Sequence, residues 1–450
     1  MKTNKKTYLL TLTAALMLGG WSCKQDALPN PLDTRLQQRL EELSPDGSLD
    51  YFRLPDSEAE LSKVPSGVGN PLTPEKIALG RMLFFETGLA EDAVHEAGKG
   101  TYSCATCHVP SAGFMPGRSQ GIADGGVGFG YNGESRNRMY GYDETELDVQ
   151  GARPLSMLNT AYVTNTTWSG KFGAHHANEG TEYAWEPGKD VELNGLGLDG
   201  LETQNIEGTR LHRMRITEGW LDTLGYLGMY DAAFPDFPIH ERYTRLTTSF
   251  ALSAYLRSLT AHQAPFQEWV RGNREAMSQS EKAGALLFYT KAGCYRCHKG
   301  PALSSNEFHA LGVLDLYQTG GFNTGPDDIR NFGRGGFTGR PEDMHLFKVP
   351  QLYNMKDSPF YFHGSSRHSL RAVVKYFNEG VPENDQVPVE NLSPYFHPLN
   401  LTEAEIDNLV EFLEHSLYDP NLERFVPEET LSGNCFPNND GLSREQLGCD

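Results

Sequence analysis

Apolar residues recur at helical spacing in several stretches of the chain, and polar residues mark where these stretches begin. In TPEKIALGRMLFFET, Thr73 is placed as an N-cap, Pro74 takes the first helical position, and an apolar stripe follows. The same spacing returns in LETQNIEGTRLHRM, ERYTRLTTSFALSAYLRSLTA and SEKAGALLFYT. In LTEAEIDNLVEFLEHSL, Thr402 and Glu405 have the spacing of a capping box. These patterns predict a mainly helical protein.

A long stretch between the first helices shows no sustained helical period. Residues 113 to about 200 are rich in glycine and polar residues, as in GIADGGVGFGYNGESRN. We predict surface loops here, arranged around something rigid. No segment shows convincing strand alternation. Because 450 residues are too many for one ordinary core, the simplest architecture is two mostly helical domains with long irregular loops.

The N-terminus has the pattern of a targeting segment. MKTNKKT supplies three lysines, and the apolar run that follows is too short to span a bilayer comfortably. Small residues precede Cys23, which predicts a signal peptide over residues 1–22 and a lipid anchor on Cys23. A plain secretory signal is the alternative. Either interpretation predicts export to the periplasmic side of the cell envelope, with residues 23–70 as a tether and a short helix.

The composition and net charge of the chain limit the classes of partner that it is expected to bind. The chain is 38% hydrophobic and 22% charged, as in ordinary soluble proteins, and its formal charge of −20 becomes −23 once the three leader lysines are removed. This charge argues against nucleic acid and fits a basic protein partner. In an oxidising compartment, Cys435 and Cys449 are expected to form a disulfide that pins the tail over residues 431–450.

One five-residue pattern occurs twice, as CATCH and as CYRCH. Its chemically active residues are Cys104, Cys107, His108, Cys294, Cys297 and His298. Two thiols three residues apart on one turn can form thioethers to the vinyl groups of one haem, and the histidine can then ligate the iron. A four-cysteine zinc site leaves the histidines unexplained, and a thioredoxin-like motif needs a βαβ context that is missing. The pattern therefore predicts two covalent haem c groups, with His108 and His298 as proximal ligands.

From about residue 71 to 417, the chain resembles the bacterial di-haem cytochrome c peroxidases, including their MauG branch. The likeness rests on IALGRMLFFETGLA, YSCATCHVPSAGF, FALSAYLRSLTAHQAPFQEWVRGN, LFKVPQLYNMKDSPFYFHGSSRHSLRAVVKYFNEG and TEAEIDNLVEFLEHSL. It implies two cytochrome c-like domains. The N-terminal domain, over residues 71–238, would carry the peroxidatic haem, and the C-terminal domain, over residues 239–430, the electron-transfer haem.

The resemblance also implies an activity, which is that of an oxidoreductase. A cytochrome-c peroxidase reduces hydrogen peroxide to water with electrons from a small cytochrome or cupredoxin. The alternative is a MauG-like oxidase that modifies a protein or small-molecule substrate. A carrier with two low-spin haems is a third class, against which the long loops speak. The sequence leaves the oligomeric state open, a homodimer included.

Four residues are candidates for work near the first haem. Trp168 in TTWSGK matches the family's tryptophan between the haems, a relay for electrons, although it could be an ordinary buried aromatic. Arg213 stands where the family places its catalytic acid. His212 and Arg213 are therefore candidates for proton shuttle and charge stabiliser, and Glu207 is a further acid. The alternative is that the last three are surface residues.

The first haem is expected to be open to peroxide without prior activation. SQGIADGG follows His108 where some members of the family carry a removable distal histidine, and His175 and His176 are the residues that could overturn this expectation. A calcium ion often sits between the family's haems. The family's asparagine ligand is not matched in GARPLSMLN, so calcium is compatible with the chain but unsupported.

The second haem departs from the family at its sixth ligand. Peroxidases of the family have methionine, and the MauG branch tyrosine, where this chain has Phe377. Phenylalanine cannot ligate iron. Tyr376, Met344 and Met355 are the candidates to replace the ligand, and a five-coordinate haem is the other alternative. The choice matters because a thioether raises a haem's potential and a phenolate lowers it.

Overall fold

The computed structural model describes residues 30–449, and the predicted signal peptide and the predicted lipid attachment site Cys23 lie outside these residues. The fold is mainly helical, as predicted, and the sheet content is two antiparallel pairs of two-residue strands. The helices are α1 (Pro31–Leu43), α2 (Pro74–Phe85), α3 (Gly200–Leu211), α4 (Glu218–Thr223), α5 (Leu227–Ala233), α6 (Ile239–Arg242), α7 (Arg245–Ser258), α8 (Pro265–Val270), α9 (Gln279–Phe288), α10 (Gly333–Thr338), α11 (Leu370–Glu379), α12 (Glu403–Glu411) and α13 (Gly441–Leu447). The strands are β1 (Gly126–Val127), β2 (Asn137–Arg138), β3 (Phe308–His309) and β4 (Phe347–Lys348).

The predicted helix starts form as the sequence indicates. The Thr73 side chain accepts a hydrogen bond from the Lys76 amide and opens α2. Thr402 and Glu405 cap the start of α12 reciprocally. Residues 113–199 form loops, short 3₁₀ turns and the β1–β2 pair, which confirms the predicted absence of a long helix there.

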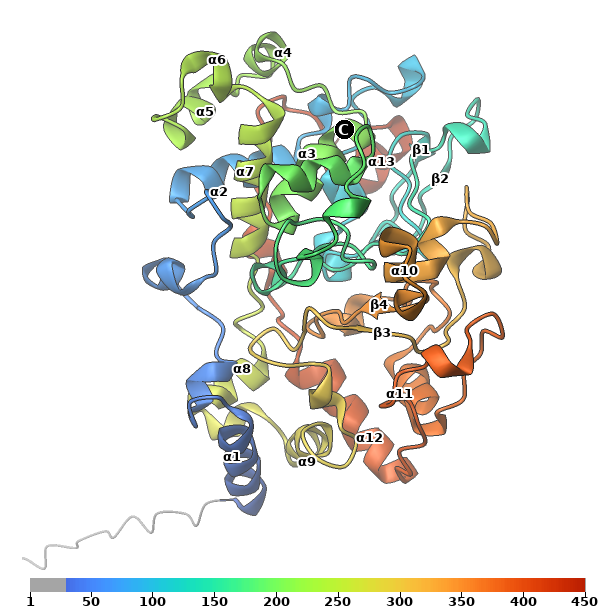
Figure 1. Cartoon of the computed structure of the whole chain (residues 1–450). Helices are drawn as coiled ribbons and strands as arrows, with labels where there is room; N and C mark the ends of the chain where they lie inside the picture. Colours follow the sequence, from blue (N-terminus) through green and yellow to red (C-terminus); the bar gives the residue numbers. More distant parts are fainter. Residues whose placement is uncertain (1–29, 450) are drawn as a thin grey trace, which may run out of the picture.

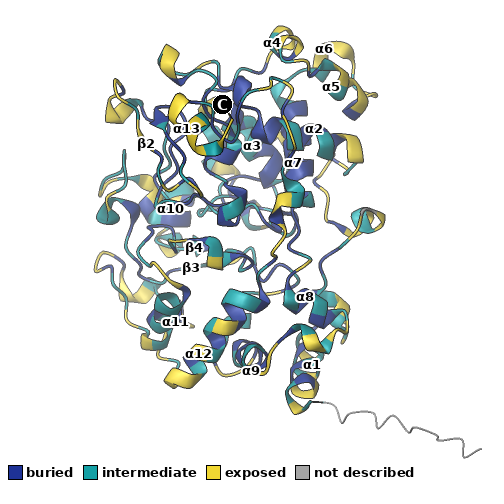
Figure 2. Cartoon of the chain, turned by 180° about the vertical axis from the view of Figure 1, so that it is seen from behind, coloured by how far each residue is buried: buried dark blue, intermediate teal, exposed yellow. Residues whose placement is uncertain are grey.

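The first half of the molecule is built around α2, α3 and α7. α7 is buried from Thr247 to Arg257 and packs closely on α2 (Figure 2). At this contact, a Cβ on Gly80 would lie 2.0 Å from the Ala251 carbonyl oxygen. The boundary predicted at residue 239 therefore differs from the packing. Over this stretch α7 is buried, polar side chains included, because its apolar residues fill the first core, and the chain crosses to the second half after Ser258.

The second half is built around α8, α9 and α12, and α1 lies beside α9 in it (Figure 1). The Asp33 carboxylate accepts hydrogen bonds from Lys282 Nζ at 3.0 Å and from Trp269 Nε1 at 2.7 Å. Leu36 and Leu40 are fully buried in this core. The segment predicted as a tether plus a short helix is thus packed into the second half over residues 31–54, whereas its end contacts the first half, where Asn70 Nδ2 donates to Glu202 and to the Phe250 carbonyl.

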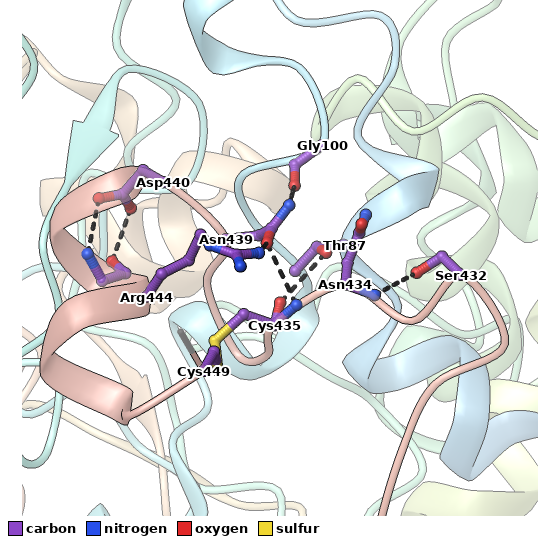
Figure 3. The surroundings of a disulfide bond; sticks show 10 residues. Thr87, Gly100, Ser432, Asn434, Cys435, Asn439, Asp440, Arg444 and Cys449 are labelled. Atoms are coloured by element: carbon purple, nitrogen blue, oxygen red, sulfur yellow. Dashed lines mark hydrogen bonds between the residues drawn. A yellow bond between two sulfur atoms is a disulfide. The ribbon is translucent and has the colours of Figure 1, made fainter.

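The C-terminal tail returns to the first half, where α13 lies near β1 and β2 (Figure 1). The predicted disulfide between Cys435 and Cys449 is present, and Figure 3 shows the tail around it. The tail grips the segment that leads into the first CxxCH motif, because Asn439 Nδ2 donates to the Gly100 carbonyl at 3.2 Å and Ser103 Oγ donates to the Pro437 carbonyl at 3.0 Å.

No helix between residues 30 and 449 combines the length and the apolar character that a membrane span requires.

Candidate functional site

A cavity of about 870 Å³ lies where the two halves meet, and both CxxCH motifs line it. The lining includes Cys104, Cys107, His108, Cys294, Cys297 and His298. The two motifs, 190 positions apart in the sequence, thus open into one connected space.

Each motif forms the same compact turn. Cys104–Thr106 and Cys294–Arg296 are 3₁₀ turns, and the amide of each following histidine donates to the carbonyl of the first cysteine, at 3.1 Å for His108 and 3.0 Å for His298. The four thiols are free of disulfides. Burial raises the pKa of Cys104, Cys107 and Cys294 to about 12 and that of Cys297 to about 11.

Both histidines are held through Nδ1, which leaves Nε2 directed away from the hydrogen bond. His108 Nδ1 is 3.2 Å from the Phe114 carbonyl, and His298 Nδ1 is 2.9 Å from the Leu303 carbonyl. Phe114 and Leu303 both have left-handed backbone, with φ of 56° and 48°. Strain of this kind at matching places indicates that each loop is shaped to present its carbonyl.

The ionisation of these histidines suits iron ligation. Burial lowers the pKa of His108 and of His298 to about 4 in both cases. A neutral imidazole that donates through Nδ1 offers an Nε2 lone pair to a metal.

Two buried cations in the cavity wall also fit haem. Lys348 Nζ donates to the Ser305 carbonyl and to Asn306 Oδ1, and the Arg153 guanidinium donates to neutral oxygens. Burial, assisted by the neighbouring Arg334, lowers the pKa of Lys348 to about 7. Buried cations are costly without an anion nearby, and haem brings anionic propionates. The anchors, the imidazoles and these cations together fit two covalently bound haems.

Three predicted residues near the first motif lie in different places. His212 follows the last turn of α3 and lines the cavity, with Nδ1 2.8 Å from Asp148 Oδ2. Glu207 also lines the cavity, and its carboxylate pairs with Arg210 Nε at 2.8 Å. Arg213 instead pairs with buried Asp124. The structure therefore brings His212 and Glu207 to the cavity and directs Arg213 elsewhere.

Asp148 is the residue that the sequence did not reveal. It is buried in the loop-rich stretch, 64 positions before His212, and no periodicity or motif marks it. Burial alone would lower the pKa of His212, but the Asp148 carboxylate more than offsets this, and the pKa is raised above its usual value.

Trp168 lies in the wall of the cavity that both motifs line. Its Nε1 donates to the Arg153 carbonyl at 2.6 Å, and its ring meets Phe347 and His363 edge to face. His175, one of the two residues considered as a distal ligand, has its Nε2 3.0 Å from the Gly197 carbonyl. His176 adjoins it in a left-handed turn.

The candidates for a sixth ligand of the second haem differ in whether they line the cavity. Met355 and Phe377 line the cavity. Tyr376 is 2% exposed and donates through its hydroxyl to the Leu311 carbonyl at 2.6 Å. Met344 packs beside Gly335. Within residues 30–449 no group of three or more His, Cys, Asp or Glu side chains is arranged to hold a metal ion, and calcium gains no support from them.

Comparisons with known proteins agree with this geometry. The family described as di-haem cytochrome c peroxidase matches residues 74–275. The methylamine utilization protein MauG of Methylorubrum extorquens is 28% identical over 374 residues, covering 82% of this chain and 84% of that one. The cytochrome-c peroxidase IdrP1 of Denitromonas iodatirespirans is 29% identical over 378 residues, covering 79% and 84%.

A solved structure shows the same fold. It is a MauG-like protein associated with microbial copper homeostasis, with a TM-score of 0.56 at 22% identity, covering 82% of this chain and 93% of that one. This likeness supports the arrangement of two cytochrome c-like domains.

Proposed function

The chain belongs to the di-haem cytochrome c peroxidase family, a family of haem oxidoreductases, and on that premise we propose that it reduces hydrogen peroxide to water with electrons from a small cytochrome or similar donor. Two ferrous donors, one hydrogen peroxide and two protons would yield two ferric donors and two waters as the O–O bond breaks. The observation that carries the proposal is the single cavity lined by both CxxCH motifs, with a histidine–carboxylate pair beside the first.

The motif residues would hold the prosthetic groups. Cys104 and Cys107 would attach one haem and Cys294 and Cys297 the other, with His108 and His298 presenting Nε2 to the irons. Each haem, when bound, supplies an iron that changes oxidation state, which no side chain here can do. The protein's own contribution is to hold the imidazoles neutral and oriented.

His212 is the residue proposed to move protons. Asp148 holds its Nδ1, so Nε2 is free to accept a proton from peroxide and return it to the departing oxygen. The raised pKa of His212 keeps this exchange within reach of neutral pH. Glu207 is the second candidate, although its carboxylate is already engaged by Arg210.

The location of the protein and its electron donor complete the proposal. Export to the periplasmic side, with a lipid anchor through Cys23, would place the enzyme where small soluble donors are available. The acidic chain would attract a basic donor, so turnover should fall as ionic strength rises.

The decisive experiment follows the ferrous band of a small cytochrome c after addition of hydrogen peroxide to the purified di-haem protein. We expect two cytochromes to be oxidised per peroxide, catalytically. The control is Cys104→Ala/Cys107→Ala, which removes the first haem's anchors. A wild-type protein whose haem spectrum does not respond to peroxide would contradict the proposal and indicate a carrier.

The second candidate is a MauG-like oxidase that modifies a protein or small-molecule substrate. The observation that favours it is Phe377 in the cavity wall, at the position where the resemblance predicts the ligand of the second haem. A protein whose haems react with peroxide but which oxidises no donor cytochrome catalytically would support this candidate over the first.

A further inference from the structure

Arg153 lies buried where the two halves of the molecule meet. It is 2% exposed, and its guanidinium donates from Nη2 to the Pro116 carbonyl at 2.7 Å and to Ser358 Oγ at 2.9 Å. Nη1 donates to the Arg118 carbonyl, and the guanidinium carbon lies 5.5 Å from the centre of the Phe360 ring. One side chain therefore joins a loop of the first half to a loop of the second.

The backbone of the same residue makes two further contacts, one across this junction and one to Trp168 within the first half. The Arg153 amide donates to the His363 carbonyl at 2.7 Å, in the second half. The Arg153 carbonyl accepts the indole N–H of Trp168 at 2.6 Å. Since the Trp168 carbonyl accepts the Lys348 amide at 2.8 Å, the tryptophan is itself tied to both halves.

These contacts are poorly explained by stability alone. The hydrogen bonds of the guanidinium go to neutral oxygens of two loops, and a haem propionate would offset the charge of Arg153 without accounting for this joining of the loops. Arginine does offer five donors in a rigid planar fork, which fixes the geometry of several acceptors at once. Precise placement of the backbone is what such a side chain supplies.

The partner of the indole N–H also matters. A backbone carbonyl accepts a hydrogen bond but takes up no proton at this position. If Trp168 gives one electron toward the first site and regains one from the second, its N–H proton can stay in place throughout. The residue then returns to its starting state with no proton to recover.

We propose that Arg153 is the positioning residue for Trp168, clamping one loop from each half so that the indole stays in the wall of the cavity that both motifs line, as a one-electron relay. This inference rests on the proposed function for the direction of electron flow. The placement of the indole by Arg153 is independent of which substrate is oxidised.

The test uses the complete di-haem protein with Arg153→Met, Arg153→Gln and Arg153→Lys. Ultraviolet resonance Raman spectra, with Trp168→Phe subtracted to isolate the Trp168 signal, report the strength of the indole hydrogen bond. Stopped-flow absorbance reports how fast the second haem, reduced beforehand, is oxidised after peroxide is added. We expect Arg153→Met to weaken the Trp168 hydrogen bond and to slow this oxidation by about tenfold or more. Arg153→Lys, which keeps the charge but not the fork, should fall between.

Arg424→Met is the matched control. Arg424 also joins two distant segments, through the Thr260 carbonyl at 2.8 Å and Asp419, and should leave the Trp168 signal unchanged. If Arg153→Met fails to fold, Arg153→Gln gives the same readouts with a smaller change in packing. An unchanged Trp168 band in the folded variants would overturn the proposal. A shifted band in a protein that oxidises no cytochrome would uphold the positioning role and count against the peroxidase function alone.

Discussion

The two CxxCH sites share their local geometry and differ in their surroundings. In both, the histidine amide closes the turn, Nδ1 faces a carbonyl on a left-handed residue, and burial lowers the pKa of the imidazole to about 4. Around the first site lie the His212–Asp148 pair and Glu207. Around the second lie Phe377 and Phe362, whose rings are 6.3 Å apart.

On the proposed function, this difference corresponds to proton transfer at the first site and electron transfer at the second. Splitting peroxide consumes protons, and the first site offers groups that can hold and return them. Electron transfer requires no proton, so the second site needs no counterpart of the His212–Asp148 pair. On the same proposal, the shared turn would hold the haem and the residues around it would set the chemistry of each site.

Removing the anchors of one haem should have the largest effect. Cys104→Ala/Cys107→Ala and Cys294→Ala/Cys297→Ala should each halve the covalent haem content, measured after denaturation and extraction. Peroxidase turnover should be lost in both, because one site lacks its reaction centre and the other its electron supply. Substantial turnover in either variant would show that the two sites do not act in series.

His212→Gln should lower kcat/KM for peroxide by about 10²- to 10⁴-fold, the usual contribution of a positioned acid–base group. The haem content and the reduction of the second haem by the donor should be unchanged. Glu207→Gln is the matched control on the same helix and should cost less, because Glu207 already pairs with Arg210. If Glu207→Gln lowers kcat/KM more than His212→Gln does, Glu207 and not His212 would be the main acid–base group.

Asp148→Asn should move the pH profile of the peroxide step. Burial and Arg213 lower the pKa of His212. Asp148 raises it by stabilising the protonated imidazole, and Glu207 acts in the same direction. As the proton acceptor, His212 must be neutral, so the rate rises as pH rises through its pKa. Without the carboxylate that pKa falls, and the acidic limb should shift to lower pH. If the acidic limb of the kcat/KM profile stays at the same pH in Asp148→Asn, the pairing of His212 with Asp148 does not control this step.

Loss of the Cys435–Cys449 disulfide should destabilise the first half more than the second. The bridge closes a separation of 14 residues, for which chain entropy predicts a contribution of about 3 kcal/mol. The variant Cys435→Ser/Cys449→Ser should unfold at lower temperature, with the first haem's absorbance changing first, because the tail grips the segment before Cys104. Identical melting of both haem signals would assign the tail to neither half in particular.

Features that are local in sequence were the predictable ones. The N-caps at Thr73 and Thr402, the disulfide and the two motif turns each involve residues within about one turn or one short loop. Apolar periodicity located α7 but could not say which core it fills, since an apolar helix fits either.

The rest depends on contacts between distant residues. His212 meets Asp148 across 64 positions, and Arg153 meets Ser358 across 205. Neither partner belongs to a motif, and both lie in loops without periodicity. The docking of α1 onto the second half could not be predicted for the same reason, because Asp33 and Lys282 are distant in the sequence and meet only in the folded chain.

Phe377→Met should give the smallest effect and the sharpest comparison between the sites. Phe377 lines the cavity, and a thioether there could reach the second iron, which would raise the potential of that haem. The reaction of peroxide at the first site should keep its rate, because that step depends on His212 and its partner. A redox titration of each haem measures the first expectation and stopped-flow absorbance the second. An unchanged potential would mean that residue 377 does not face the iron, and Met355, already in the cavity wall, would become the ligand to replace next.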